Sequence, residues 1–232
     1  MSKKQQSPII QLNKVWKTYT MGEAKVHALR GINFEVREGE FIAIMGTSGS
    51  GKSTMMNLVG ALDVPSKGTI HLQGRNIAEM SESDLAQLRG RTVGFIFQKF
   101  NLIDTLTAKQ NVTLPLMFQG INEEERDKRG KELLTMVELA DRMNHRPNEL
   151  SGGQQQRVAI ARALAAQPKL ILADEPTGNL DTKTGDTVMS FLKKLHKQGT
   201  TIVMVTHDKQ TAKNADRIEV LRDGQIITQE KK

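Results

Sequence analysis

A glycine-rich stretch at residues 46–54 constrains this chain more than any other feature. It fits the pattern G-x-x-x-x-G-K-[ST], follows the apolar run 41–45 and precedes residues 55–59, which can continue as a helix. Glycines let successive backbone N–H groups face inward as an anion nest, and the start of a helix adds its positive end. The stretch therefore predicts a polyphosphate site, in which Lys52 reaches the β- and γ-phosphates and Ser53 holds a magnesium ion. The expected ligands are Gly46, Thr47, Ser48, Gly49, Ser50, Gly51, Lys52, Ser53 and Thr54.

The order of the apolar and polar segments predicts an α/β nucleotide core that a helical insertion interrupts. Residues 16–21, which include Tyr19, are expected to form a polar loop, and Pro115 is expected to kink or end its helix. Asp223-Gly224 between two alternating runs predicts a hairpin. The expected strands are 9–15, 32–36, 41–45, 69–72, 93–97, 170–173, 200–206, 217–221 and 225–229. The expected helices are 81–89, 107–118, 122–139, 151–167 and 182–197.

Composition limits the classes of protein that this chain can belong to. Its 232 residues are enough for one large domain, and the absence of cysteine excludes disulfides and thiolate catalysis. The net charge is +7, but the basic residues are scattered and aromatic residues make up only 4%, so nucleic-acid binding is not expected. No apolar run approaches the roughly 18 residues of a membrane span, and the N-terminus has no signal-like stretch, so we expect a cytoplasmic chain.

Polar side chains follow the predicted parallel strands at their carboxyl ends, where ligands bind in open α/β sheets. Asp174 and Glu175 follow a buried strand, and such carboxylates need a partner, which magnesium would provide for Asp174. Glu175 could then polarise a water for attack on the γ-phosphate. His207 could position the same water, and Gln98 has the donor and acceptor groups for water or magnesium. Taken alone, each of these residues could also be interpreted as an ordinary polar residue of a turn or loop.

Five ordered signals coincide in this chain: residues 46–53, Gln98, the segment Leu-Ser-Gly-Gly-Gln at 150–154, residues 170–175 and His207. Together they resemble the nucleotide-binding subunit of an ABC transporter over almost the whole chain. The resemblance implies a P-loop NTPase core with a mainly parallel sheet, an antiparallel β subdomain and a helical subdomain insertion. It implies one domain, 1–232, with 1–98 and 168–232 as the core and β subdomain and 99–167 as the helical subdomain.

The resemblance also implies residue roles. Tyr19 matches the aromatic residue that stacks on adenine, and Gln98 matches the residue that senses the γ-phosphate and contacts the transmembrane partner. Lys52, Gln98, Glu175 and His207 match catalytic groups, while Ser53, Gln98 and Asp174 match magnesium ligands. Asp181 matches the loop at the dimer seam. Ser151, Gly152, Gly153 and Gln154 match the signature that faces the γ-phosphate of a second copy; as the start of a helix, they also form a second anion site.

Finer segments are similar to the group that contains lipoprotein-release, macrolide-export and cell-division ATPases, although Thr47 stands where that group usually has proline. The expected function is ATP hydrolysis by a dimer of two copies, with ATP and Mg²⁺, on the cytoplasmic face of a membrane. That dimer would drive a separate transmembrane permease. A regulatory ATPase that moves no solute has the same motifs, so that alternative stays open. A nucleic-acid-acting ABC ATPase would call for a coiled-coil insertion, zinc modules or tandem cassettes, and the sequence has none of these.

Overall fold

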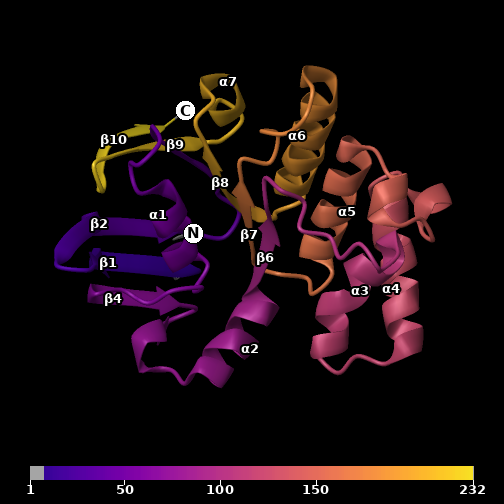
Figure 1. Cartoon of the computed structure of the whole chain (residues 1–232), viewed down its shortest axis with the longest axis horizontal. Helices are drawn as coiled ribbons and strands as arrows, with labels where there is room; N and C mark the ends of the chain where they lie inside the picture. The colour runs from indigo at the N-terminus through magenta and orange to yellow at the C-terminus, as the bar shows by residue number, and fades with distance from the viewer. Residues whose placement is uncertain (1–7, 232) are drawn as a thin grey trace, which may run out of the picture.

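The computed structural model describes residues 8–231, and within this range a mainly parallel six-stranded sheet forms the centre of the molecule (Figure 1). Its strand order is β10-β9-β3-β8-β7-β6, and only the β9–β10 hairpin in it pairs antiparallel. The strands are β3 (Phe41–Met45), β6 (Val93–Ile96), β7 (Leu170–Asp174), β8 (Thr201–Thr206), β9 (Arg217–Arg222) and β10 (Gln225–Lys231). The predicted α/β core with a mainly parallel sheet is confirmed. Residues 1–7, which belong to the N-terminal stretch where no signal sequence is expected, lie outside the described residues.

A second, antiparallel sheet lies beside the first, with the order β2-β1-β4-β5. Its strands are β1 (Ile10–Met21), β2 (Ala24–Val36), β4 (Lys67–Leu72) and β5 (Arg75–Asn76). The predicted loop at 16–21 is wrong, because β1 continues there and pairs Tyr19 with Val26. Register shifts between Leu12 and Thr18 interrupt the alternation of side chains, and Ala24–His27 are exposed. The part of β1 and β2 around residues 16–27 therefore has no regular alternation of apolar and polar residues from which a strand could be predicted.

Helices surround the two sheets, and polar caps set most of their first residues. Ser81, Thr107, Asn122, Ser151 and Asp181 each accept a hydrogen bond from the backbone N–H three residues later. Pro115 does not end its helix, which continues to Phe118, whereas the helix after Ser151 ends at Leu164, before the predicted Gln167. The helices are α1 (Lys52–Val59), α2 (Glu82–Thr92), α3 (Ala108–Phe118), α4 (Glu123–Met136), α5 (Gly152–Leu164), α6 (Thr182–Lys197) and α7 (Lys209–Ala212).

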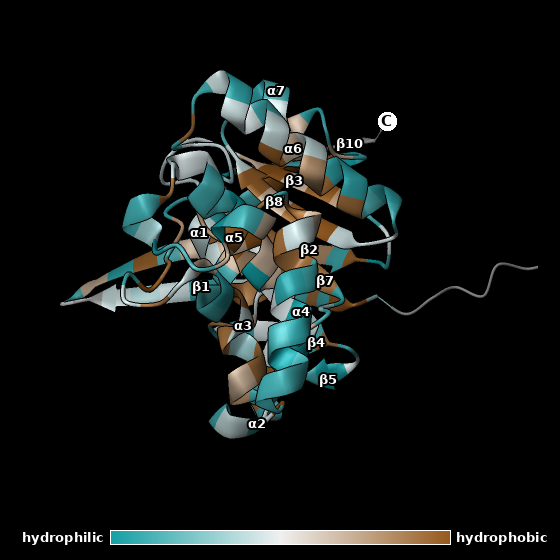
Figure 2. Cartoon of the chain, turned by 90° about the vertical axis from the view of Figure 1, so that its right-hand side faces the viewer, coloured by the Kyte–Doolittle hydropathy of each residue, from teal (hydrophilic) through white to brown (hydrophobic). Residues whose placement is uncertain are grey.

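Two hydrophobic cores lie on the two faces of the six-stranded sheet. The central strands β3 and β8 are largely hydrophobic in sequence, whereas the outer helix α4 is largely hydrophilic (Figure 2). Phe41 and Ala43 of β3 pack with α3, α4, α5 and α6, while Ile42 and Ile44 pack with α1 and the antiparallel sheet. The central strands are therefore apolar on both sides, as buried parallel strands are. No helix in the described part of the chain is long and apolar enough to cross a membrane. This layering leaves the carboxyl ends of β3, β6, β7 and β8 at one edge, where the predicted site residues follow them.

Candidate nucleotide site

The loop between β3 and α1 has the backbone geometry of an anion nest. Gly49 and Gly51 have φ of +78° and +103°, which side-chain-bearing residues rarely adopt. A Cβ at Gly51 would lie 2.5 Å from the Ala28 carbonyl oxygen, and one at Gly46 would overlap the Leu221 carbonyl oxygen. A Cβ at Gly49 would meet no heavy atom within 4 Å. Glycine is thus required where the loop packs on β2 and β9, and the loop is open where a ligand would approach.

Several hydrogen-bond donors around this loop could turn to a bound ligand. Helix α1 has no side-chain cap and no acidic residue in its first turn, so its first N–H groups and its positive dipole end serve the loop. The Ser50 Oγ is buried and has no hydrogen-bond partner among residues 8–231, and the Lys52 ammonium donates to the Thr47 carbonyl at 2.8 Å. Thr54 is half-buried and Ser53 is exposed on the same turn. This donor set fits a polyphosphate, which would accept from several of these groups at once.

Asp174 ends β7 as a half-buried carboxylate that the protein alone stabilises poorly. Burial raises the pKa of Asp174, the neighbouring Glu175 raises it further, and Lys52 lowers it. Within residues 8–231 no three acidic, histidine or cysteine side chains cluster as a metal site. A magnesium ion here would therefore need oxygens from the Ser53 hydroxyl and the phosphates beside Asp174, which is the mixed ligand set that magnesium prefers.

Glu175 and His207 come together although 32 residues separate them. The Glu175 Oε1 lies 2.7 Å from the His207 Nδ1, and the Glu175 backbone N–H donates to the Val205 carbonyl of β8 at 2.8 Å. Glu175 has φ of 43°, an uncommon conformation for a non-glycine residue that costs on the order of 1 kcal/mol. Its side chain is largely buried, whereas His207 is exposed. The imidazole can therefore orient the carboxylate toward a water.

Gln98 is oriented toward the segment after Glu175. Its Nε2 donates to the Asn179 Oδ1 at 3.4 Å, and the Asn179 Nδ2 donates to the Gln98 carbonyl at 2.9 Å. A Cβ on Gly178 would lie 2.8 Å from the Gln98 Nε2. The structure thus brings Gln98 to residues 178–179, while its predicted role at magnesium stays a prediction.

The predicted signature forms the first turn of α5. The Ser151 Oγ accepts from the Gln154 N–H at 3.3 Å, and the Gln154 Oε1 accepts from the Ser151 N–H at 2.9 Å. Ser151 and Gly152 are exposed, and a Cβ at Gly153 would overlap the Thr184 side chain of α6. Among the described residues, no hydrogen bond joins this turn to the phosphate loop of the same chain. The turn therefore presents N–H groups to the outside.

The other two predicted residues have structural contacts of their own. Asp181 caps α6 by accepting from the Thr184 N–H at 3.0 Å and the Thr184 hydroxyl at 2.6 Å. These hydrogen bonds lower the pKa of Asp181, so the carboxylate stays ionised. Tyr19 lies on β1, and its hydroxyl donates to the Asp63 Oδ2 at 3.3 Å. The predicted roles of both residues toward a nucleotide stay predictions.

Sequence reasoning missed Gln156, two residues after the signature. The side chain of Gln156 is 0% exposed, and its Nε2 donates to the Pro176 carbonyl at 2.7 Å. It thus ties the signature helix to the residue next to Glu175. One signal in the sequence could have identified it. Gln156 lies four residues before Ile160 and so on the same face of the helix, where an apolar side chain is expected.

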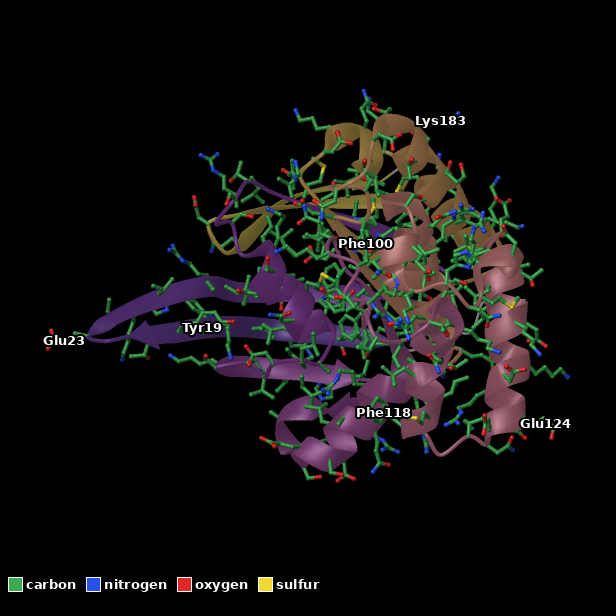
Figure 3. All side chains as sticks on the ribbon, turned by 45° about the vertical axis from the view of Figure 1, so that its right-hand side comes forward. Tyr19, Glu23, Phe100, Phe118, Glu124 and Lys183 are labelled. Carbon is green, nitrogen blue, oxygen red and sulfur yellow. The ribbon has the colours of Figure 1, made fainter. Side chains whose placement is uncertain are left out.

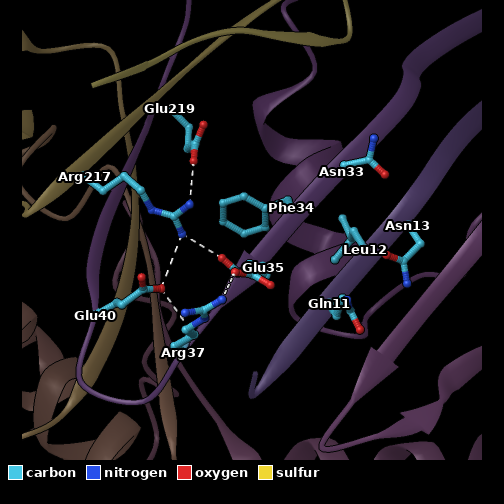
Figure 4. A pocket seen from close by; sticks show the side chains of 10 residues that line it. All are labelled: Gln11, Leu12, Asn13, Asn33, Phe34, Glu35, Arg37, Glu40, Arg217 and Glu219. Atoms are coloured by element: carbon cyan, nitrogen blue, oxygen red, sulfur yellow. Dashed lines mark hydrogen bonds and ion pairs between the residues drawn. The ribbon is translucent and has the colours of Figure 1, made fainter. Parts of the chain in front are cut away.

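A cavity of about 330 Å³ lies elsewhere, between β1, β2 and β9 (Figure 4). Arg217 is central to it and donates to the Glu219 Oε1 at 2.9 Å and to the Glu35 carbonyl at 2.7 Å. The cavity also includes Glu40, directly before β3, whereas the phosphate loop begins after the other end of that strand. The cavity is therefore separate from the strand ends that carry the site.

The comparisons with known proteins agree with this geometry. A family model described as "ABC transporter" matches residues 29–178. The ABC transporter ATP-binding protein MJ0796 of Methanocaldococcus jannaschii is 51% identical over 228 residues, which cover 96% of this chain and 97% of that protein. The ATP-binding/permease protein MacB of Brucella melitensis is 49% identical over 222 residues, 96% of this chain and 34% of MacB.

Solved structures match the whole fold as well. The dimeric post-hydrolysis structure of MJ0796 bound to ADP and Pi has a TM-score of 0.88 at 50% sequence identity, covering 96% of this chain and 98% of that chain. A second dimeric MJ0796 structure also has a TM-score of 0.88, at 51% identity. The family match covers the phosphate loop, Gln98, the signature and Glu175, which are the residues the fold gathers or exposes. This chain therefore belongs to the ABC transporter family, as one of its ATP-binding and ATP-hydrolysing cassettes.

Proposed function

We propose that two copies of this chain bind two ATP molecules between them, with the phosphate loop of each copy facing the signature turn of the other. The observation that carries this proposal is the first turn of α5: Ser151 and Gly152 are exposed, and among the described residues no hydrogen bond joins this turn to the phosphate loop of its own chain. A polyphosphate held by one copy would meet these donors in a second copy. The dimeric structures of MJ0796 support this arrangement.

The residues of each copy have distinct roles in hydrolysis. The loop N–H groups and Lys52 bind the β- and γ-phosphates, and Ser53 with Asp174 would hold magnesium, which when bound neutralises phosphate charge. A water oxygen attacks the γ-phosphorus, its proton passes to Glu175, and the bond to the β-phosphate oxygen breaks, which releases ADP. His207 orients Glu175 across 2.7 Å. Gln98 would sense the γ-phosphate from its place beside Asn179.

The partner of this dimer is proposed to be a separate membrane permease of the macrolide-export or mechanotransmission type, with the cassette at the cytoplasmic face of the membrane. MacB supports this, since its name joins an ATP-binding part to a permease. Exposed apolar residues also support it: Phe118 and Met117 at the end of α3 are 78% and 49% exposed, and Ile103 after Gln98 is 43% exposed. Figure 3 shows Phe118 on the helical part of the molecule. We further propose that residues 99–167, which contain α3, α4 and α5, act as a helical subdomain toward that partner.

The test of the dimer uses the Glu175→Gln variant with ATP and magnesium. Removing the base should allow ATP binding but stop its turnover, so light scattering should give twice the monomer mass. Lys52→Ala should bind no nucleotide and stay monomeric. Glu38→Gln, an exposed glutamate in a turn, is the control and should behave like the wild type. A Glu175→Gln protein that stays monomeric and hydrolyses ATP at the wild-type rate would refute the proposal.

The test of the permease partner is co-purification from membranes followed by reconstitution in vesicles. ATP-driven movement of a solute across the vesicle supports a transporter. An ATPase that binds its membrane partner yet moves no solute would instead support the regulatory alternative.

A further inference from the structure

A lysine and an aspartate hold Tyr19 in place near the far end of α1. The Lys17 Nζ lies 2.6 Å from the Asp63 Oδ1 and donates to the Val64 carbonyl at 2.9 Å. The same ammonium lies over the Tyr19 ring, 5.2 Å from its centroid, and the Tyr19 hydroxyl donates to the Asp63 Oδ2 at 3.3 Å. We call Lys17 and Asp63 the Tyr19 clamp. Both carboxylate oxygens of Asp63 are thus occupied, one by each of the other two residues.

The Tyr19 clamp joins two elements that both reach the phosphate loop. Asp63 follows α1, the helix that begins at Lys52, and Lys17 lies on β1, where it pairs with Leu29 of β2. Leu29 and Ala28 are the β2 residues closest to Gly51, since a Cβ there would lie 3.0 Å from the Leu29 side chain and 2.5 Å from the Ala28 carbonyl. The position of Tyr19 is therefore set relative to the loop that would hold the phosphates.

Tyr19 needs such a tether because of where it lies. The β1–β2 hairpin projects from the body of the molecule, with Tyr19 along it and Glu23 at its tip (Figure 3). The residue Tyr19 is 37% exposed, whereas the side chain of Lys17 is only 12% exposed. The ammonium is thus largely withdrawn from water, where attraction to an aromatic face is stronger than at an exposed site. The ammonium lies over one face of the ring, and Tyr19 as a whole is still 37% exposed, so a nucleobase can reach part of it.

We propose that Lys17 and Asp63 are positioning residues for the nucleobase, which hold the Tyr19 ring in the orientation that stacks on adenine. This inference rests on the proposed nucleotide function, in which Tyr19 is the base platform. A ring that is already fixed loses less rotational freedom when the base binds, so the clamp should strengthen the contribution of the base to affinity. It should not change the contribution of the phosphates, which the loop at residues 46–54 provides.

The test separates base from phosphate by measuring dissociation constants for ADP and for inorganic tripolyphosphate by calorimetry. Asp63→Asn and Tyr19→Phe should each weaken ADP binding by about threefold to tenfold and leave tripolyphosphate binding unchanged. In the ATPase assay they should raise KM by the same factor at constant kcat, which is the signature of lost uniform binding. Glu23→Gln removes a carboxylate from the same hairpin as the matched control, and it should change neither constant.

Three outcomes would overturn the proposed role of the Tyr19 clamp. If Asp63→Asn weakens tripolyphosphate as much as ADP, Asp63 acts through α1 and the phosphate loop. If Asp63→Asn and Tyr19→Phe both bind ADP like the wild type while Tyr19→Ala binds it more weakly, the ring is a platform that needs no positioning. An unchanged ADP affinity in Tyr19→Ala would refute both the role of Tyr19 as the base platform and the role of the Tyr19 clamp. The proposed nucleotide site itself would be refuted by a different result, namely wild-type ADP binding by Lys52→Ala.

Discussion

Replacing Gln156 by glutamate tests whether the signature helix is tied to the segment that carries Glu175. Gln156 is 0% exposed and its Nε2 donates to the Pro176 carbonyl at 2.7 Å. Glutamate has the same shape but offers an oxygen in place of the donor nitrogen. An ionised carboxylate would repel the carbonyl oxygen, so the folded variant must keep its proton, which can then donate to Pro176.

The cost of keeping this proton sets the size of the effect. A fully buried glutamate can have its pKa raised by about 3–5 units from an ordinary value near 4.3, so the group stays neutral in the folded protein at pH 7. At about 1.4 kcal/mol per pH unit, holding the proton costs about 3.7 kcal/mol at pH 7 and about 1 kcal/mol at pH 5. Because the folded pKa is raised, the stability of the variant is greatest below pH 4.3 and falls as the pH rises toward the folded value.

Urea denaturation of the wild type and the variant at pH 5, 6 and 7 measures this difference. The destabilisation by Gln156→Glu should grow by about 1.4 kcal/mol per pH unit across the series. Gln87→Glu, on the exposed face of α2, makes the same chemical change in water and should show almost no pH-dependent difference. A destabilisation by Gln156→Glu that is constant from pH 5 to pH 7 would refute the buried hydrogen bond to Pro176.

Two further predictions concern the site itself. Burial and Glu175 raise the pKa of Asp174, so its ionised form is less stable in the ligand-free folded protein than in water. Asp174→Asn should therefore raise Tm by about 1–2 °C at pH 7 and abolish magnesium-dependent hydrolysis. The gain in Tm should shrink as the pH falls through the raised pKa of Asp174. A lower Tm for the variant at pH 7 would contradict this prediction. Ser151→Ala should cost about 1 kcal/mol in urea denaturation by removing the α5 cap. Ser151→Asp should keep the cap and the wild-type stability, but its carboxylate should repel a γ-phosphate. The double variant Ser151→Asp, Glu175→Gln should therefore form no ATP-induced dimer in light scattering.

Local signals determined much of the fold before any tertiary contact was known. The strand Phe41–Met45 and the helix Thr182–Lys197 have the predicted bounds, because a continuous apolar run and a cap at Asp181 act within the segment itself. The hairpin around Asp223-Gly224 is confirmed for the same reason, since both residues have positive φ. The phosphate loop is also local: its glycines, its lysine and the start of the following helix lie within residues 46–54.

The sequence by itself therefore determined that this chain is an α/β protein with a phosphate loop, and which polar residues follow the parallel strands. Only the tertiary structure decided which of these residues meet. The pairing of Glu175 with His207, the turn of Gln98 toward Asn179 and the contact of Gln156 with Pro176 all cross between elements far apart in the chain. The extension of β1 past Val15 likewise depends on its partner strand. Hydrogen bonds between distant segments leave no period in the sequence, because their geometry is set by the packing of helices and strands around the sheet.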